Sequence, residues 1–457
     1  MGEPMSNLHN YNHYVSEFES FGKNGASEYP EWVNTLRRSA LAVFAEKGFP
    51  TTHDENWKYT NIAPIAKTSF KYASDKLALD DPGHQVGSFM IEGLEHHSIV
   101  FINGKFSKEY SSIDELPAGV IVTTMREAVR ANAELVKKYI SQYVPLENNA
   151  FAALNTAFLN DGVFVYVPED VEIDKPIHCL FITSKAGTEH YAVHIRNLII
   201  VEERSKVRFA FSYRSSDENQ NLTNVVTEIV AKEGSDVEAV KIQKESDSTY
   251  HVENFRLHQF AKSTVNVFSL ALGSAIARND MSVIIDGEGA DCNLNGLYFT
   301  AGDQLIDHHT FMHHIHPNCP SHELFKGILY GNSRAVFNGK VYVEPEAQKT
   351  DSKQTNRNLL LSDTAVVDTK PELEIFADDV KCTHGAAVGG LDPVHAFYLK
   401  SRGISAENAE KMLTVGFAAE VTGKIVTPEI RRYVDVLVVD RLREKLGSLG
   451  LPDIVHN

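Results

Sequence analysis

The middle of this chain alternates apolar and polar residues with a period of two, and this pattern constrains its fold more than any other feature. The alternation is clear in Val163–Val167 and in Val207–Phe211, and strand patterns continue as far as Gly390 without a helix signal. A period of two places successive side chains on opposite faces of a strand. We therefore predict that residues 161–391 are almost entirely β-structure.

The β-rich region also repeats itself about every thirty residues, a spacing typical of solenoid proteins. An apolar strand end, a short turn and a small residue precede each new strand. The small residues are Ser205, Ser235, Ser263, Ala290, Ser333 and Thr364, with one overlong step after Ala290. Because such coils must stack to bury their apolar faces, we predict a right-handed parallel β-helix. A sandwich of evenly spaced hairpins is the alternative, since the repeat is degenerate.

Helical patterns flank this region on both sides. Those before it are an apolar repeat over residues 31–47, a capping box of Thr124 with Glu127, and a repeat over residues 151–158. Those after it begin at Asp392-Pro393, Ser405 and Thr427-Pro428. The predicted organisation is a loosely held tail (1–30), an N-terminal helical region (31–160) with a strand-like patch at Ser98–Ile102, a β-helix core (161–391) and a C-terminal helical region (392–457).

Charge and composition exclude several classes of partner. The 457 residues include 44 basic and 61 acidic side chains, and a net charge of −17 disfavours binding to nucleic acids and anionic membranes. Apolar stretches are short, so we expect no transmembrane helix. The first residues lack a secretory pattern, and we expect a cytoplasmic protein. The four cysteines, Cys179, Cys292, Cys319 and Cys382, are too few for a disulfide framework.

Common catalytic motifs are missing from the sequence. The nearest string to a phosphate-binding loop, Gly416 to Ile425, has the wrong spacing and ends in isoleucine instead of serine or threonine. No G-x-G-x-x-G follows a strand, and neither H-E-x-x-H nor G-x-S-x-G occurs. We therefore do not expect a self-contained nucleotidase, dehydrogenase or serine hydrolase.

Residues 307–327, DHHTFMHHIHPNCPSHELFKG, are the most polar stretch and lie within the overlong step. On an extended strand one face would carry His308, Met312, His314 and His316, and the other His309, Phe311 and His313; His316, Cys319 and His322 are spaced three apart. Imidazole and thiolate ligands suit zinc or iron. The alternative to a metal site is a set of polar side chains that face solvent or form ladders between coils.

A second candidate site is the pair Cys382 and His384 near the end of the β-rich region. On extended backbone the two side chains point the same way, which places a thiol beside an imidazole that can accept its proton or join it in binding a soft metal. Nearby Gly385, Gly389 and Gly390 allow another chain to approach closely. By itself the C-x-H spacing also fits a structural cysteine beside a surface histidine.

These residues lie in a segment that resembles the SufB/SufD family of iron-sulfur cluster assembly proteins. The resemblance is carried by residues 354–405, by ENWKYTN (55–61), by FAALNTAF (151–158) and by an H-x-x-P-x-C-x-S pattern around Pro317 and Cys319. It covers most of the chain from about residue 30. SufB-type chains carry cysteine at the position of Thr355 and His-Glu-Ala at residues 384–386, so the two departures favour the SufD branch.

The resemblance implies a β-helix flanked by helical regions and a role as a non-enzymatic scaffold. It implies pairing with a SufB-like homologue through the ends of the β-helices, and a SufC-like ATPase on the C-terminal helical region. The cargo would be a transient iron-sulfur cluster shared with the partner and built from sulfur that a desulfurase system supplies. His384 is the implicated residue, with Cys382 beside it as a second candidate ligand. We also expect the isolated chain to form homodimers.

A β-helix enzyme, such as a polysaccharide lyase or isomerase, is the alternative from another functional class. It would place acidic and basic groups in an exposed groove along a parallel sheet. The alternative also predicts secretion, for which the sequence carries no signal.

Overall fold

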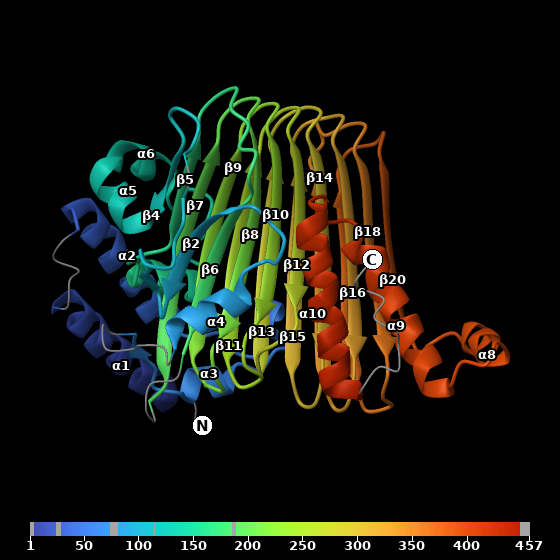
Figure 1. The fold of residues 1–457 in the computed structure, drawn as a ribbon. Helices are drawn as coiled ribbons and strands as arrows, with labels where there is room; N and C mark the ends of the chain where they lie inside the picture. Colours follow the sequence, from blue (N-terminus) through green and yellow to red (C-terminus); the bar gives the residue numbers. More distant parts are fainter. Residues whose placement is uncertain (1–3, 24–28, 74–80, 114, 185–188, 448–457) are drawn as a thin grey trace.

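Two large, mostly parallel sheets face each other and enclose most of the apolar core (Figure 1). The computed structural model describes residues 4–23, 29–73, 81–113, 115–184 and 189–447. Sheet A contains β4 (Ile121–Thr124), β5 (Val163–Val167), β7 (Tyr191–Val201), β9 (Leu222–Ala231), β11 (Tyr250–Gln259), β13 (Ile276–Ile285), β15 (Leu305–His314), β17 (Arg334–Val343) and β19 (Val366–Ile375), with β1 (Lys71–Tyr72) beside β7.

Sheet B lies opposite sheet A. It contains β3 (Lys105–Phe106), β2 (His97–Ile102), β6 (Ile177–Thr183), β8 (Lys206–Ser215), β10 (Asp236–Lys244), β12 (Thr264–Ala271), β14 (Asp291–Thr300), β16 (Pro320–Leu329), β18 (Asp351–Leu360) and β20 (Lys381–Gly389). From β5 onward the chain alternates between the sheets, and each strand pairs in parallel with the strand two positions later. The predicted parallel β-helix is confirmed, because a sandwich of hairpins would pair neighbours antiparallel.

The overlong repeat step has a simple structural cause. Ser263 and Ala290 directly precede strands of sheet B, whereas Ser333 directly precedes β17 of sheet A. The positions of sheet B equivalent to Ala290 are instead Cys319, before β16, and Thr350, before β18. The overlong step is therefore not an insertion; it arises because the series of small residues moves from sheet B, at Ala290, to sheet A, at Ser333.

Helices of the N-terminal region cover the outer face of sheet A. They are α1 (Pro4–Lys23), α2 (Glu31–Lys47), η2 (Glu55–Trp57), α3 (Ala63–Lys67), α4 (Pro82–Phe89), α5 (Met125–Ala131), α6 (Ala133–Tyr139) and α7 (Ala150–Ala157), of which α4 lies against sheet B. Aromatic residues of α1, α2 and α7 form one cluster on sheet A. Thr124 is the N-cap of α5, because its Oγ1 accepts a hydrogen bond from the Glu127 backbone, but the helix it starts is interrupted at Asn132.

The predicted loose tail over residues 1–30 is wrong for residues 4–23. This segment forms α1, and Tyr14 and Phe21 are buried in the aromatic cluster beside Phe44 and Phe158. Apolar burial of two aromatic side chains is worth about 2 kcal/mol each, enough to hold the helix in place. Residues 1–3 and 24–28 of the predicted tail lie outside the described residues.

Three helices follow the last strand: α8 (Pro393–Ser401), α9 (Ala406–Thr422) and α10 (Pro428–Leu446). Their predicted starts are confirmed, and the side chains of Asp392 and Ser405 accept backbone hydrogen bonds as N-caps. The helices α9 and α10 pack on the outer face of sheet B, whereas α8 buries no residue and projects from the open end of the solenoid (Figure 1). The predicted C-terminal region also includes residues 448–457, which are outside the described part of the chain. Among the described residues, no helix is long and apolar enough to cross a membrane.

Candidate functional site

The last coil of the solenoid, formed by β19 and β20, presents an open end. Within the described residues no strand pairs with the outer edge of either strand. Residues 383–389 of β20 are exposed, and large apolar side chains are exposed at Val366, Phe376 and Val388. An unpaired edge offers backbone donors and acceptors, so this end can pair with a strand of another chain.

Cys382 and His384 both lie on β20 and face the direction of the solenoid interior. Their register partners on β18, Ser352 and Gln354, are buried there. Cys382 is half-buried against the interior apolar cluster, whereas His384 is exposed because no further coil covers it. Residues two apart on a strand are separated by about 7 Å, so both side chains can reach one small inorganic group at the open end.

The electrostatic surroundings keep Cys382 in its thiol form. Burial raises the pKa of the Cys382 thiol above its ordinary value, and the nearby carboxylate of Asp351 raises it further. A hydrogen bond from the Ser352 backbone lowers the pKa but does not outweigh these two effects. The thiol is free of any disulfide. Binding of a soft metal would therefore have to displace the thiol proton.

A short polar column lies beneath His384. The register aligns His384 on β20 with Gln354 on β18 and Glu323 on β16, and the next position, on β14, is the buried Leu294. Gln354 Nε2 donates a hydrogen bond to Glu323 Oε2 at 2.8 Å. A Cβ atom on Gly339 of the opposite sheet would overlap Gln354 Nε2, so glycine makes room for the amide. Burial raises the pKa of Glu323 to about 7, although the hydrogen bond from Gln354 opposes the shift.

The two positions that distinguish this chain from SufB-type chains are neighbours in space. Thr355 on β18 is the register partner of Gly385 on β20, and both line a cavity of about 250 Å³. A second cavity of about 520 Å³ lies between sheet B and α9, lined by Lys353, Arg357 and other polar residues. Thr355 and Gly385 are about thirty residues, or one coil, apart in the sequence, but they belong to one surface beside His384.

Histidines on β15 alternate between the interior and the outside as predicted, but the prediction was wrong for His316, which follows the end of the strand and is exposed. His308 is buried with its ring 5.3 Å from those of Tyr298 and Phe325. His314 is buried too, and its Nε2 lies 2.9 Å from Ser321 Oγ. Burial lowers the pKa of His308 to about 3 and that of His314 to about 4, so both are neutral at physiological pH.

Three outward histidines of the same stretch are paired with carboxylates: His309 with Asp307, His313 with Glu344 and His316 with Asp286. His322 is exposed on β16. Cys319 is buried in the turn before β16, where its thiol hydrogen-bonds to the carbonyl oxygen of Gly287 at 3.2 Å. Among the residues that the structure describes, no group of three His, Cys, Asp or Glu side chains is arranged to hold a metal ion. The stretch builds ladders between coils, which was the alternative to a metal site.

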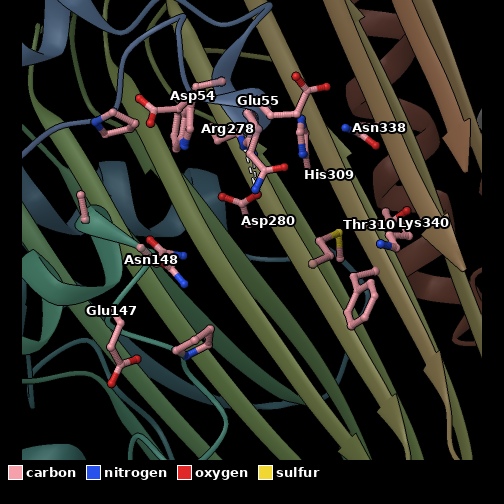
Figure 2. Close-up of a pocket in the computed structure, with 18 of the residues that line it drawn as sticks. Asp54, Glu55, Glu147, Asn148, Arg278, Asp280, His309, Thr310, Asn338 and Lys340 are labelled. Atoms are coloured by element: carbon pink, nitrogen blue, oxygen red, sulfur yellow. Dashed lines mark hydrogen bonds and ion pairs between the residues drawn. The ribbon is translucent and has the colours of Figure 1, made fainter. Parts of the chain in front are cut away.

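A groove of about 700 Å³ runs along the outer face of sheet A next to the N-terminal region (Figure 2). Figure 2 shows Arg278 and Asp280 on its floor, and Asp54 and Glu55 from the N-terminal segment above them. Arg278 binds Asp280 at 2.7 Å, and Lys370 binds Glu55 at 3.0 Å. The Arg278–Asp280 pair lies within β13, whereas the Lys370–Glu55 pair crosses the groove and joins the N-terminal segment to sheet A.

The ENWKYTN motif forms this attachment. The guanidinium group of Arg278 lies 4.3 Å from the centre of the Trp57 ring and donates to the carbonyl oxygen of Asn56 at 2.9 Å. Thr60 and Arg278 both donate hydrogen bonds to buried Asp307. Burial raises the pKa of Asp307, but Arg278 and His309 outweigh burial and hold that pKa well below its usual range. The motif therefore has a structural role.

Comparison with known proteins assigns the family. A family model described as the SufBD core domain of the SUF iron-sulfur cluster assembly system matches residues 181–417, and a model of the SufBD N-terminal region matches residues 8–179. This chain belongs to the SufBD family of iron-sulfur cluster assembly proteins. The family assignment confirms the resemblance found in the sequence and does not favour a polysaccharide lyase or isomerase.

Several SufBD relatives align over most of their length. A SufBD family protein of Synechocystis is 31% identical, with 85% of this chain and 86% of the relative covered. The iron-sulfur cluster assembly protein SufD of Escherichia coli is 29% identical, covering 93% of this chain and 95% of the relative. SufD of Bacillus subtilis is 27% identical, with 90% and 94% covered.

The sequence singles out His384 and Cys382, which stay predicted site residues, but it did not point us to the residues beneath them. Gln354 was part of the motif that carried the family resemblance, and Glu323 was part of the histidine-rich stretch. Their contact joins residues 31 positions apart, and it depends on the register of β16 with β18. The sequence signal for this contact is a pair of inward-facing polar residues that lie one coil length apart.

Proposed function

We propose that this chain is a non-catalytic scaffold subunit on which a nascent iron-sulfur cluster is built. It pairs with a SufB-like homologue through β19 and β20 and carries a SufC-like ATPase on its C-terminal helices. The sulfur is delivered by a desulfurase system. The observation that carries the proposal is the position of His384 and Cys382 on one face of the terminal, unpaired strand.

The proposed ligands fit iron and sulfide, which are the cargo of the scaffold. An exposed neutral imidazole offers a nitrogen lone pair, and a thiol can lose its proton to a soft metal. A cluster at the end of a strand is open on one side, so a partner chain can supply the remaining ligands. At Gly385 a Cβ atom would meet no other atom within 4 Å, so packing within the chain does not require glycine there. A glycine at this position leaves space for a partner's backbone.

Features of α8 support the docking of an ATPase. Val394 and Phe397 are each 69% exposed and Tyr398 is 56% exposed, although α8 projects into solvent on its own. Exposed apolar groups that cluster on one helix are typical of a protein interface. An ATP-driven partner is consistent with the lack of a phosphate-binding loop in the sequence.

Purification of the tagged chain from its native cells tests this proposal. We expect a SufB-like chain and a SufC-like ATPase to copurify with it in defined stoichiometry, together with iron and acid-labile sulfide. A matched sample with Val388→Asp on β20 should lose the SufB-like chain but keep the ATPase. Recovery of the wild-type chain without either partner, under conditions that preserve SUF complexes, would contradict the proposal.

A further inference from the structure

The polar column beneath His384 is unusual because its lower end is a buried carboxyl group. Glu323 is 3% exposed and Gln354 is 1% exposed, and both lie inside the solenoid. Transfer of a carboxyl group into a protein interior costs several kcal/mol unless it is fully paired. Besides Gln354, the Thr310 side chain faces the Glu323 carboxyl group, whereas Gln354 Oε1 is buried without a hydrogen-bond partner in the described structure. A buried pair of this kind is therefore costly, and Gln354 Oε1 is available to a further donor.

The hydrogen bond to Glu323 fixes the orientation of the Gln354 amide. A carboxyl oxygen that accepts a hydrogen bond must face the amide nitrogen, and Gln354 Nε2 lies 2.8 Å from Glu323 Oε2. Gly339 on the opposite sheet provides the space in which this nitrogen sits. The amide oxygen of Gln354, Oε1, then has no hydrogen-bond partner in the described structure, and it can only accept a hydrogen bond.

His384 is the residue next to Gln354 on the side of the open end. Register partners on adjacent parallel strands lie about 4.8 Å apart and point their side chains to the same face. A histidine that ligates a metal usually donates its other ring N–H to an oxygen acceptor, which fixes the tautomer of the ring. Gln354 Oε1 is an acceptor without a partner at the neighbouring position.

We infer that Gln354 is a positioning residue for His384: Glu323 orients the Gln354 amide, whose carbonyl oxygen accepts the ring N–H of His384 and leaves the other ring nitrogen free to bind iron. The inference rests on the proposed function of His384. It adds two residues inside the solenoid to the site: Gln354, one coil from His384, and Glu323, two coils from it. The next register position, Leu294, is apolar. Gln354 thus selects which ring nitrogen of His384 faces the partner chain.

The test measures the tautomer of His384 in the isolated full-length chain. Histidine is labelled with ¹⁵N in the ring, and the His384 signals are assigned by comparison with His384→Ala. We expect one neutral tautomer in the wild-type chain and a mixture of two tautomers in Gln354→Leu. Gln243→Leu is the matched control, because Gln243 lies on β10, far from β20, is also buried, and also donates to a buried carboxyl group, that of Glu245.

A swap of the two side chains gives a rescue experiment. In the double variant Glu323→Gln with Gln354→Glu, the amide donates to the carboxylate and the carboxylate accepts from His384. The single tautomer should therefore return. The cluster content of the assembled complex should change together with the tautomer of His384. We expect it to decrease about tenfold in Gln354→Leu and to recover in the double variant.

Two results would overturn the inference. One is an identical His384 tautomer in the wild-type chain and Gln354→Leu; the other is a change in cluster content that the swap does not reverse. Failure of the proposed function gives a different result, since His384→Ala would then assemble a normal amount of cluster whatever the tautomer of His384 in the wild-type chain.

Discussion

Gln354 and His384 occupy equivalent positions on adjacent strands, one closed inside the solenoid and the other open at its end. The two residues differ in exposure because the coil that carries His384 is the last one. In a β-solenoid the inward-facing side chains of each coil are covered by the next coil. Only a terminal coil therefore leaves its inward-facing side chains exposed. This geometry makes an interior side chain available to a partner without any change in the fold.

Substitutions on α8 should weaken binding of the ATPase. Val394→Asp with Phe397→Asp places two charges on the exposed apolar face, and we expect an affinity loss of more than about tenfold. Titration calorimetry with the purified ATPase measures this loss. Lys67→Asp, an exposed change in the N-terminal region, is the control. Unchanged affinity in the double variant would exclude α8 as the docking surface.

Deletion of the entire C-terminal region is a poorer test than these point variants. The helices α9 and α10 cover apolar side chains of sheet B, including Leu270, Leu297 and Ile328. Removal of everything after Asp392 would expose that surface and destabilise the sheet, so loss of binding would have two explanations.

The isolated chain should form a homodimer through its open end. An equivalent edge of a second copy can pair with β20 and cover Val388, which is 46% exposed. In sedimentation velocity at micromolar concentration we expect a dimer for the wild-type chain and a monomer for Val388→Asp. Tyr330→Asp, on a turn away from this edge, should remain dimeric. A monomeric wild-type chain would contradict the prediction.

Buried neutral histidines should make the protein less stable in mild acid. The pKa of His308 is lowered to about 3 when folded, so the unfolded chain binds its proton first and stability falls as the pH drops below about 6.5. At pH 5 this histidine alone costs about 2 kcal/mol. His308→Phe should therefore reduce the difference in unfolding free energy between pH 7.5 and pH 5 by about that amount. Exposed His322→Gln is the control, and an equal pH dependence in His308→Phe and wild type would contradict the assignment.

The attachment of the N-terminal region depends on Asp307. Asp307→Asn leaves the buried guanidinium of Arg278 short of one carboxylate, and we expect a loss of about 3 kcal/mol in urea unfolding. Lys370→Ala removes an exposed ion pair to the same motif and should cost less than about 1 kcal/mol. Similar losses in the two variants would mean that burial of the Arg278–Asp307 pair has no special importance.

The sequence predicted the fold well because the fold is periodic. Alternation in Val207–Phe211 and the recurrence of small residues before the strands are both direct consequences of stacked coils. The overlong step arose because Cys319 was not counted among the small residues, although it fills the same buried turn position before a strand of sheet B as Ala290. Side-chain volume, not thiol chemistry, decides that position.

Contacts between distant segments were harder to predict. Tyr14, Phe18 and Phe21 follow a helical spacing that could have revealed α1, but their polar neighbours hid the pattern. Gln354 and Glu323 required the register of two strands, and a shift of one residue would turn both side chains to the outside. Periodicity therefore predicts strands and coils, while polar contacts inside the solenoid depend on exact register.

We propose that His384 contributes to a nascent cluster at the open end of the solenoid. The most direct test is the iron and acid-labile sulfide content of the assembled complex with His384→Ala. Thr383→Ala is the matched control, because Thr383 is an exposed neighbour on the opposite face of β20. With subunit composition intact in both variants, we predict a loss of at least about tenfold in His384→Ala and none in Thr383→Ala. Wild-type iron and sulfide content in His384→Ala would contradict the account.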